Sequence, residues 1–485
     1  MLAAKYHKLT ATLRGTAAVA ALLVGALATV ALSPTAAHAE TLSQAMADAY
    51  AGNPRLQSAR AQLRSTDENL AIAQSGYRPT VSSSASYAVR DSHSDPKALG
   101  DGTTSSRSYD LQANQTLYNG GQTRAAVSEA DAQIRAQRES LRDTEQTVLL
   151  SVITAYMNVI RDRTALDLQT HNVDVLNKEL KQVKARFDVG EVTKTDVEQA
   201  RASLAAAQSQ LELSKANLRA SSSSYMLVVG HGPNGVKEPA PPFKLLPRSA
   251  EDAVDIAMAS RPAVIRAAYL KDASDHNIVR LYGQLLPQVT LRGDVNSTAQ
   301  AGAVGNENTT ATLTGQVTVP IYEGGNIRAQ IRQQKESRQA QLEDIEQARI
   351  QARSDVLTAW AALDASRAQL IANQTQVESA KIALEGVRAE LQVGQRTELD
   401  VLNAQQTLNS AQLQLTTTKR DIVVNAYTIL QVMGRLGADQ VGLNVAKYDV
   451  ERHYEDTNGS WWKTTISREE GYVGIAGDVQ AATKQ

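Results

Sequence analysis

The sequence predicts an α+β membrane protein that is internally duplicated, with four β-strands in each chain and long coiled-coil helices. Three observations support this prediction. Marked segments recur about 200 residues apart, long polar segments carry an apolar residue at every seventh position, and shorter segments alternate apolar with polar residues. A spacing of seven is typical of a coiled coil and a spacing of two is typical of a strand. We therefore expect two similar halves, each with a strand pair and a helix pair.

The duplication is visible in two pairs of matching segments. "TLYNGGQTRAA" (116–126) has a near copy in "PIYEGGNIRAQ" (320–330), and "FDVGEVTKTDV" (187–197) matches "LQVGQRTELDV" (391–401) at the same spacing of 204 residues. A unit of this length far exceeds the repeats of solenoid proteins, so it indicates two similar halves.

The expected organisation is a signal peptide, a first repeat, a Pro-rich linker, a second repeat and a tail, at residues 1–39, 40–230, 231–248, 249–435 and 436–485. The signal has basic residues before an apolar run at 17–32, and Ala37-His38-Ala39 offers a cleavage site before Glu40. An N-terminal membrane helix is the weaker alternative, because the run is barely long enough to span a bilayer. We expect the tail to be equatorial or partly disordered.

The long helices follow from one apolar position that recurs in each half. The recurring residues are Val152, Val159, Leu166, Val173, Leu180 and Phe187 in the first half, and Val356, Leu363, Leu370, Val377, Leu384 and Leu391 in the second. The pattern resumes after Gly190 and after Gly394, so each half is expected to hold a helical hairpin, at about 121–230 and 324–434, bent at these glycines. The first arm, about 122–189, would be roughly 100 Å long.

The strands are expected as one β-hairpin in each half, at about 80–118 and 287–320. Apolar residues that alternate with polar ones would share one face, and they are Val81, Ala85, Tyr87, Val89, Tyr109, Leu111, Ala113, Leu117, Val289, Leu291, Val295, Ala311, Leu313, Val317 and Val319. The polar stretches at 91–107 and 296–309 are interpreted as loops. Strands of about ten residues with this alternation fit transmembrane β-strands, and a half-buried soluble sheet is the alternative.

Four strands cannot close a barrel, and an open edge in lipid leaves backbone groups unpaired. If these strands span a membrane, several chains must therefore share one barrel. The Tyr-x-Gly-Gly segments then mark the joints where a strand leaves the membrane and a long helix begins, with glycine giving the backbone freedom for the turn. The joint residues are Tyr118, Gly120, Gly121, Tyr322, Gly324 and Gly325. A phosphate loop is disfavoured because the Lys and Ser/Thr of such loops are missing.

The composition excludes several classes of function. The chain has no cysteine, which excludes disulfides, thiolate metal sites and cysteine nucleophiles. Its 50 Lys+Arg against 51 Asp+Glu give no electrostatic reason to expect a nucleic-acid partner. The seven histidines are scattered without metal-ligand spacing, and no nucleophile elbow, phosphate loop or triad is visible. We expect no enzyme, no cofactor and no metal.

Over about 41–435 the chain resembles the TolC-like outer-membrane efflux channels of Gram-negative bacteria. The features that carry the resemblance are the signal, the duplicated halves, the strand pairs, the long arms, the Tyr-x-Gly-Gly joints and the "VG…TxxDV" bends. The resemblance implies a homotrimer with a twelve-stranded barrel in the outer membrane and a twelve-helix tunnel through the periplasm. It also implies an exit duct that works with a periplasmic adaptor protein and an inner-membrane pump or ABC exporter, in tripartite efflux or type I secretion. The alternative is a periplasmic coiled-coil adaptor that conducts nothing.

The resemblance further implies a periplasmic gate at the helix bends. The matching positions are Asp196, Arg396 and Asp400, with Arg396 bridging to Asp196 and an Asp400 ring at the pore mouth. Leu391 and Asn403 replace a tyrosine and an aspartate of well-known members, which implies fewer bonds and a less acidic mouth. The alternative from the residues themselves is helix capping, because Thr-x-x-Asp at 193–196 and 397–400 is a helix-start signature.

Overall fold

The computed structural model describes residues 40–93, 95, 102–301 and 306–458 of the 485-residue chain. The predicted signal peptide (1–39), the end of the predicted tail (459–485) and parts of both predicted loops lie outside the described residues.

Both repeats have the same order of elements: two shorter helices, two strands, a very long helix and a returning helix. The first repeat contains α2 (Leu42–Gly52), α3 (Pro54–Ser75), β1 (Thr80–Ser92), β2 (Gly102–Asn119), α4 (Gln122–Asp188) and α5 (Lys194–Val229). The second contains α6 (Ala250–Ser260), α7 (Pro262–Gly283), β3 (Gln288–Ala301), β4 (Asn306–Thr318), α8 (Asn326–Gln392) and α9 (Glu398–Val432). Two short helices lie outside the repeats: η1 (Phe243–Leu245) follows the first repeat and α10 (Arg452–Thr457) follows the second. Because α4 and α8 each have 67 residues, and α3 and α7 each have 22, the predicted duplication is confirmed.

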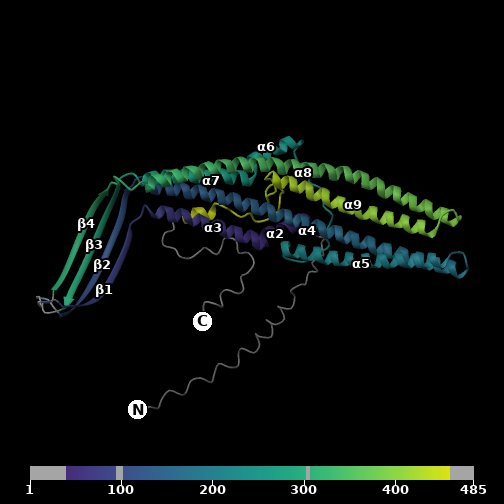
Figure 1. Ribbon diagram of the computed structural model, residues 1–485, viewed down its shortest axis with the longest axis horizontal. Coiled ribbons are helices and arrows are strands. Elements are labelled where there is room, and N and C mark those ends of the chain that lie inside the picture. Colours follow the sequence, from purple (N-terminus) through teal and green to yellow (C-terminus); the bar gives the residue numbers. More distant parts are fainter. Residues whose placement is uncertain (1–39, 94, 96–101, 302–305, 459–485) are drawn as a thin grey trace, which may run out of the picture.

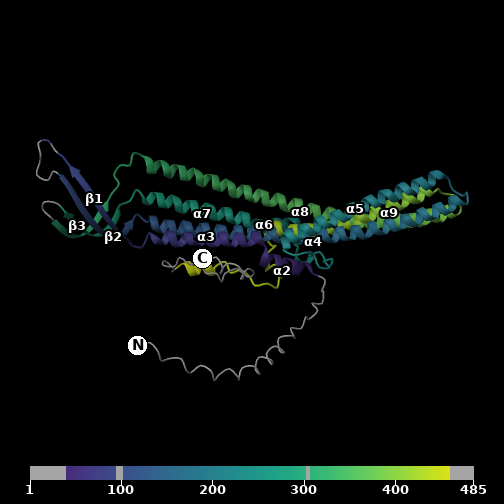
Figure 2. The ribbon, with the colours of Figure 1, turned by 90° about the horizontal axis from the view of Figure 1, so that it is seen from below.

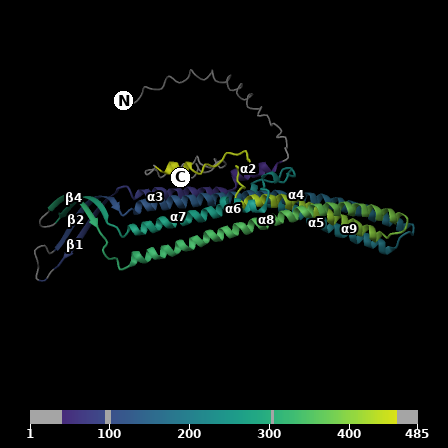
Figure 3. The ribbon, with the colours of Figure 1, turned by 90° about the horizontal axis from the view of Figure 1, so that it is seen from above.

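The molecule is long, with the sheet at one end and the two helix bends at the other (Figure 1). α4 and α8 run from the sheet to the bends, and at 1.5 Å per residue each is about 100 Å long. α5 and α9 return along them only to the middle, while α3 and α7 occupy the part next to the sheet, as Figures 2 and 3 show. α7 packs between α4 and α8 and so joins the two repeats.

The four strands form one antiparallel sheet in the order β1-β2-β3-β4. Its register places apolar residues of neighbouring strands opposite one another: Val81 faces Ala113, Leu111 faces Val295, and Val295 in turn faces Ala311. Residues directly opposite in an antiparallel pair share one face. The predicted apolar face is thus confirmed across the sheet, and β1 and β4 are its two edges.

The strands are longer than expected, with 13, 18, 14 and 13 residues for β1 to β4. The predicted loops at 91–107 and 296–309 were wrong in part, since strand pairing continues through residues 102–107, 296–301 and 306–309. Ser and Thr side chains there take part in the pairing, as in the 3.1 Å hydrogen bond that the Thr309 hydroxyl donates to Ser297. A β-bulge near the base of β2 also breaks the alternation, because Tyr118 rather than Leu117 pairs with Val289.

The core consists of two apolar clusters along the helices. The cluster in the middle of the molecule surrounds Tyr156 and Tyr225, which are both fully buried. The second lies toward the bends, where Leu180 of α4 packs with Val197 and Leu204 of α5. Burial of one large apolar side chain contributes roughly 1.5 to 3 kcal/mol. These clusters therefore hold the long helices together in pairs.

The Tyr-x-Gly-Gly joints turn on glycines in the left-handed region. Gly121 (φ 79°) and Gly325 (φ 83°) are the N-cap residues of α4 and α8. Gly120 (φ 66°) also lies against α7, where a Cβ atom would stand 2.2 Å from the backbone oxygen of Gly283. Only glycine meets both conditions at this position. The equivalent glycine is Gly324, at φ 67°, and the joint tyrosines Tyr118 and Tyr322 are 48% and 84% exposed.

The described part of the tail packs on the first repeat. Tyr448 donates its backbone N–H to the Tyr50 hydroxyl at 3.1 Å, and Tyr454 donates its hydroxyl to Asp131 at 3.2 Å. Between them, the buried His453 ring lies 3.2 Å from the Asp67 carboxylate of α3. Residues 436–458 thus cover one side of α2, α3 and α4.

Among the helices of the described ranges, none combines the length and the apolar character that crossing a bilayer requires.

Candidate functional site

The two helix bends have almost the same local structure. After α4, Gly190 (φ 81°) donates its N–H to Phe187, and the next N–H, that of Glu191, reaches back to Arg186 at 2.9 Å. After α8, Gly394 (φ 77°) donates to Leu391 at 3.0 Å, and the following N–H reaches Glu390. This pair of bonds is the Schellman motif, which ends a helix at a left-handed glycine. The sequence Val-Gly therefore sets the turn at both tips.

Asp196 and Asp400 cap the helices that leave the bends. Asp196 accepts hydrogen bonds from the backbone N–H and the hydroxyl of Thr193, both at 2.8 Å, and Asp400 accepts the same two from Thr397 at 2.9 and 2.8 Å. In return each threonine hydroxyl accepts the backbone N–H of its aspartate at 3.3 Å. The capping interpretation is confirmed at both bends.

These hydrogen bonds also fix the charge of both carboxylates. The hydroxyl and backbone N–H of Thr193 hold the pKa of Asp196 below its ordinary value. The backbone N–H and hydroxyl of Thr397 do the same to the pKa of Asp400. Both carboxylates are therefore negative at neutral pH, at the far end of the molecule from the sheet (Figure 1).

Arg396 lies in the second bend and pairs within its own hairpin. Its Nε donates to Glu390 at 2.8 Å, and both side chains are about half exposed. Across the described ranges, no ion pair joins Arg396 to Asp196 or to Asp400 within the chain. The bridge from Arg396 to Asp196 stays a prediction.

The two replaced positions lie on the same tips. Leu391 is half-buried in the last turn of α8, and its backbone oxygen accepts the N–H of Gly394. Asn403 is exposed on α9 and lines a groove of about 430 Å³ between α4, α5 and α9. Polar side chains cross this groove, including Gln405, whose amide nitrogen lies 3.4 Å from Asn172. The gate roles predicted for Leu391 and Asn403 remain predictions.

One contact that sequence reasoning missed joins the two hairpins at their tips. Arg186, in the last turn of α4, lies 3.4 Å from the carboxylate of Glu398, the first residue of α9. The Glu398 side chain is only 4% exposed, and one of its oxygens has no hydrogen-bond partner. Burial, followed by a hydrogen bond with Glu179, raises the pKa of Glu398 to about 7.

The sequence did hold a signal for this contact. Positions 204 apart are equivalent, and Arg186 and Glu390 have opposite charges, as do Lys194 and Glu398. Where equivalent positions of two repeats carry opposite charges, a positive residue of one repeat can pair with a negative residue of the other. Of these four residues, Arg186 and Glu398 form the contact between the repeats, whereas Glu390 pairs with Arg396 within its own hairpin.

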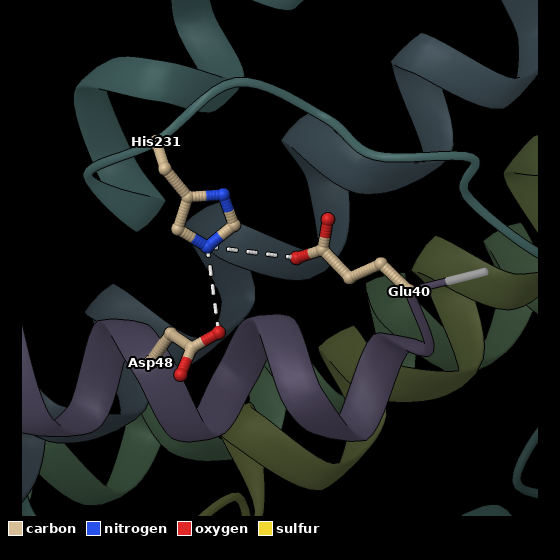
Figure 4. Close-up of side chains that lie close together, drawn as sticks. All are labelled: Glu40, Asp48 and His231. Atoms are coloured by element: carbon tan, nitrogen blue, oxygen red, sulfur yellow. Dashed lines mark hydrogen bonds and ion pairs between the residues drawn. The ribbon is translucent and has the colours of Figure 1, made fainter. Parts of the chain in front are cut away.

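A second group that sequence reasoning missed lies near the middle of the molecule. Glu40, Asp48 and His231 come from three segments and bring their side-chain tips together (Figure 4). His231 was one of the scattered histidines, and its neighbours lie in a different part of the sequence.

A family model described as "Outer membrane efflux protein" matches residues 45–231 and 253–435. The chain belongs to the outer membrane efflux protein family. The two matched ranges correspond to the two repeats. The family resemblance predicted from the sequence is thus confirmed. Members of this family are outer-membrane channels, not enzymes. The long helices extend from the outer membrane into the periplasm.

Individual relatives agree with this assignment. The chain is 39% identical to outer membrane efflux protein BepC of Brucella suis over 434 residues, which cover 89% of this chain and 93% of that protein. It is 25% identical to outer membrane protein TolC of Escherichia coli over 432 residues, 84% of this chain and 85% of TolC. The solved structure of the Campylobacter jejuni CmeC outer membrane channel has the same fold, with a TM-score of 0.72, 16% identity and coverage of 86% and 89%.

Proposed function

We propose that three copies of this chain form one continuous duct that carries substrates from an inner-membrane pump or exporter across the periplasm and the outer membrane. The observation that carries the proposal is the open sheet with one apolar face, joined directly to helices about 100 Å long. A coiled-coil adaptor needs the helices but has no use for such a sheet.

Closure of the barrel requires other copies of the chain. β1 and β4 are edge strands, and neither pairs with a further strand among the residues that the structure describes. In lipid each unpaired group costs several kcal/mol, so an open edge is not viable there. β1 of one chain pairs with β4 of the next, which keeps the sheet antiparallel, and three chains supply twelve strands.

The two faces of the sheet then meet lipid and water. The exposed apolar residues Leu111 (50% exposed) and Leu313 (74%) lie on the face that contacts lipid. The opposite face carries the row Gln112, Asp294 and Thr312, which lines the lumen. This arrangement is the one that transmembrane β-strands use.

The helical hairpins continue the duct, and their bends close its periplasmic end. Each chain supplies α4 with α5 and α8 with α9, so three chains supply twelve helices at the tips. Asp196, Asp400 and Arg396 lie at these bends and are the charged groups of the gate, with Leu391 and Asn403 beside them. Arg396 exchanges its partner Glu390 for Asp196 of a neighbouring hairpin when the tips come together.

The duct requires protein partners at its inner end. A periplasmic adaptor contacts the bends and connects them to an inner-membrane pump or ABC exporter. The chain itself has no catalytic role and no cofactor. In the family this arrangement serves tripartite efflux and type I secretion.

Conductance of single channels in planar bilayers tests the gate. Arg396→Ala and Asp196→Ala are expected to raise conductance, because each removes one partner of a bridge that holds the tips closed. Thr193→Ala is the matched control, since it removes the helix cap, at a cost of about 0.5 to 2 kcal/mol, but keeps the charge of Asp196. If Asp196→Ala and Thr193→Ala lose thermal stability alike and all three variants leave conductance unchanged, capping is the whole role of Asp196 and Arg396 has no part in a gate.

A further inference from the structure

Three potential metal ligands meet where the N-terminal segment crosses the end of the first repeat. His231 follows Gly230, the residue that ends α5, while Asp48 lies on α2 and Glu40 two residues before α2. The His231 Nε2 atom is 3.4 Å from Oδ2 of Asp48 and 3.8 Å from Oε1 of Glu40. All three ligand atoms lie within 4.8 Å of one another (Figure 4).

The orientation of the imidazole ring makes its Nε2 atom an electron-pair donor. Nδ1 of His231 lies 3.0 Å from the backbone oxygen of Gly232. A carbonyl oxygen can only accept, so Nδ1 carries the proton of the neutral ring and Nε2 carries the lone pair. In the neutral ring this lone pair faces two carboxylates, so the group needs a positive ion between them, either a metal cation or a second proton on the ring. A backbone carbonyl on the other ring nitrogen is also the usual support for a metal-bound histidine.

The buried member of the group is held in place by its surroundings. Glu40 is 7% exposed, and its side chain accepts hydrogen bonds from the Tyr225 hydroxyl and from the backbone N–H of Asn234 at 3.2 Å. Its backbone oxygen accepts the hydroxyl of the fully buried Tyr156 at 2.8 Å. Tyr225 donates to Oε1, the oxygen that lies nearest His231, and Asn234 donates to Oε2, so these partners orient the carboxylate and leave one lone pair on each oxygen. Pre-oriented ligands of this kind lower the cost of binding an ion.

The spacing of the ligands fits a small divalent cation. With metal–ligand bonds of about 2.0 to 2.2 Å, neighbouring ligands of a tetrahedral site stand about 3.3 to 3.6 Å apart. The two distances from Nε2, 3.4 and 3.8 Å, are close to this range. The side chains of Asp48 and His231 are 56% and 44% exposed, so an ion can enter from solvent and keep a water ligand.

We propose that Glu40, Asp48 and His231 bind one Zn²⁺-class divalent cation per chain. A site of one imidazole and two carboxylates suits zinc and its neighbours in the first transition row, whereas Mg²⁺ and Ca²⁺ prefer all-oxygen sites. The ion ties the segment before α2 to the turn after α5. It therefore fixes the N-terminal segment against the middle of the long helices, away from both the sheet and the gate.

The test is a zinc titration of the purified full-length mature protein, prepared without a histidine tag and stripped with a chelator. Calorimetry is expected to find one tight zinc site per chain that a tenfold excess of Mg²⁺ does not displace. His231→Gln and Asp48→Asn are each expected to weaken this site at least about tenfold, because each removes a direct ligand. His171→Gln, which changes an exposed histidine of α4, is the matched control and is expected to leave it unchanged.

A second readout keeps the result independent of folding. Co²⁺ in place of zinc is expected to give visible absorption bands of a four- or five-coordinate site, which are lost in His231→Gln while the amount of protein in the outer membrane stays normal. Zinc binding that is the same in His231→Gln and in the unchanged protein would overturn the proposal. So would the absence of a tight site, which would leave a proton on His231 as the cation between the carboxylates.

Discussion

Leu313→Arg tests which face of the sheet meets lipid. Leu313 lies near the middle of β4 (Asn306–Thr318), opposite Gly293, and is 74% exposed in the single chain. An arginine there would stand close to the bilayer midplane, where it costs about 2 to 4 kcal/mol in each chain. Three copies in the proposed trimer add up to about 6 to 12 kcal/mol, which is similar to the whole stability of a typical domain. We expect the trimer to fail to assemble.

The assay is the amount of the variant in purified outer membrane and the temperature at which its oligomer dissociates on a gel. Thr312→Arg is the matched control, because the neighbouring residue lies on the other face and opposite Asp294. A charge pair of opposite sign at such positions is neutral or mildly stabilising, by about 0.2 to 1 kcal/mol. Gln112 is a poorer control, since Arg292 already donates to it at 3.1 Å. Equal loss of both variants would refute the assignment of the faces.

Two further predictions concern single residues. Burial raises the pKa of Glu398 from 4.5 to about 7, so its contribution to the stability of the folded tip is complete below about pH 4.5 and is lost as the pH rises through about 7. Glu398→Gln should abolish this pH dependence of stability, measured by hydrogen exchange of the backbone amides at the bend. Glu198→Gln changes an exposed residue and should leave the pH dependence as it is. The same pH dependence of stability in both variants would contradict the assignment. Gly120→Ala should lower the thermal stability, since it adds at least about 1 to 2 kcal/mol of backbone strain and a clash with Gly283. The control is Gly52→Ala, where the added Cβ atom meets open space and the thermal stability should not fall.

Much of the fold could be predicted from the sequence because it depends on short-range patterns. The heptad spacing predicted helices that end at Gly190 and Gly394, and the alternation predicted which residues share a face of the sheet. Local rules also predicted both capping boxes, since Thr193 and Asp196 are only three residues apart. The strand ends were less predictable. A polar segment that would form a loop on its own stays extended when it forms hydrogen bonds to a neighbouring strand.

The missed parts of the site depend on contacts between distant segments. Arg186 and Glu398 meet only because the two hairpins lie side by side, and the raised pKa of Glu398 follows from burial that no local pattern encodes. Glu40 and His231 meet because the N-terminal segment crosses the linker after α5. The predicted bridge between Arg396 and Asp196 is not formed within the described residues of one chain, where Arg396 pairs with Glu390, and it stays a prediction.

Closure of the barrel by three chains is the central claim, and cysteine cross-linking tests it most directly. The chain has no cysteine, so Ser84→Cys in β1 and Thr310→Cys in β4 introduce the only two thiols, in one row of the polar face. A short bifunctional thiol reagent applied to outer membranes would join β1 of one chain to β4 of the next. The account predicts linked species of two and three chains and none larger, because the ring closes at three. A ladder that continues beyond three chains, or cross-links confined to single chains, would contradict it.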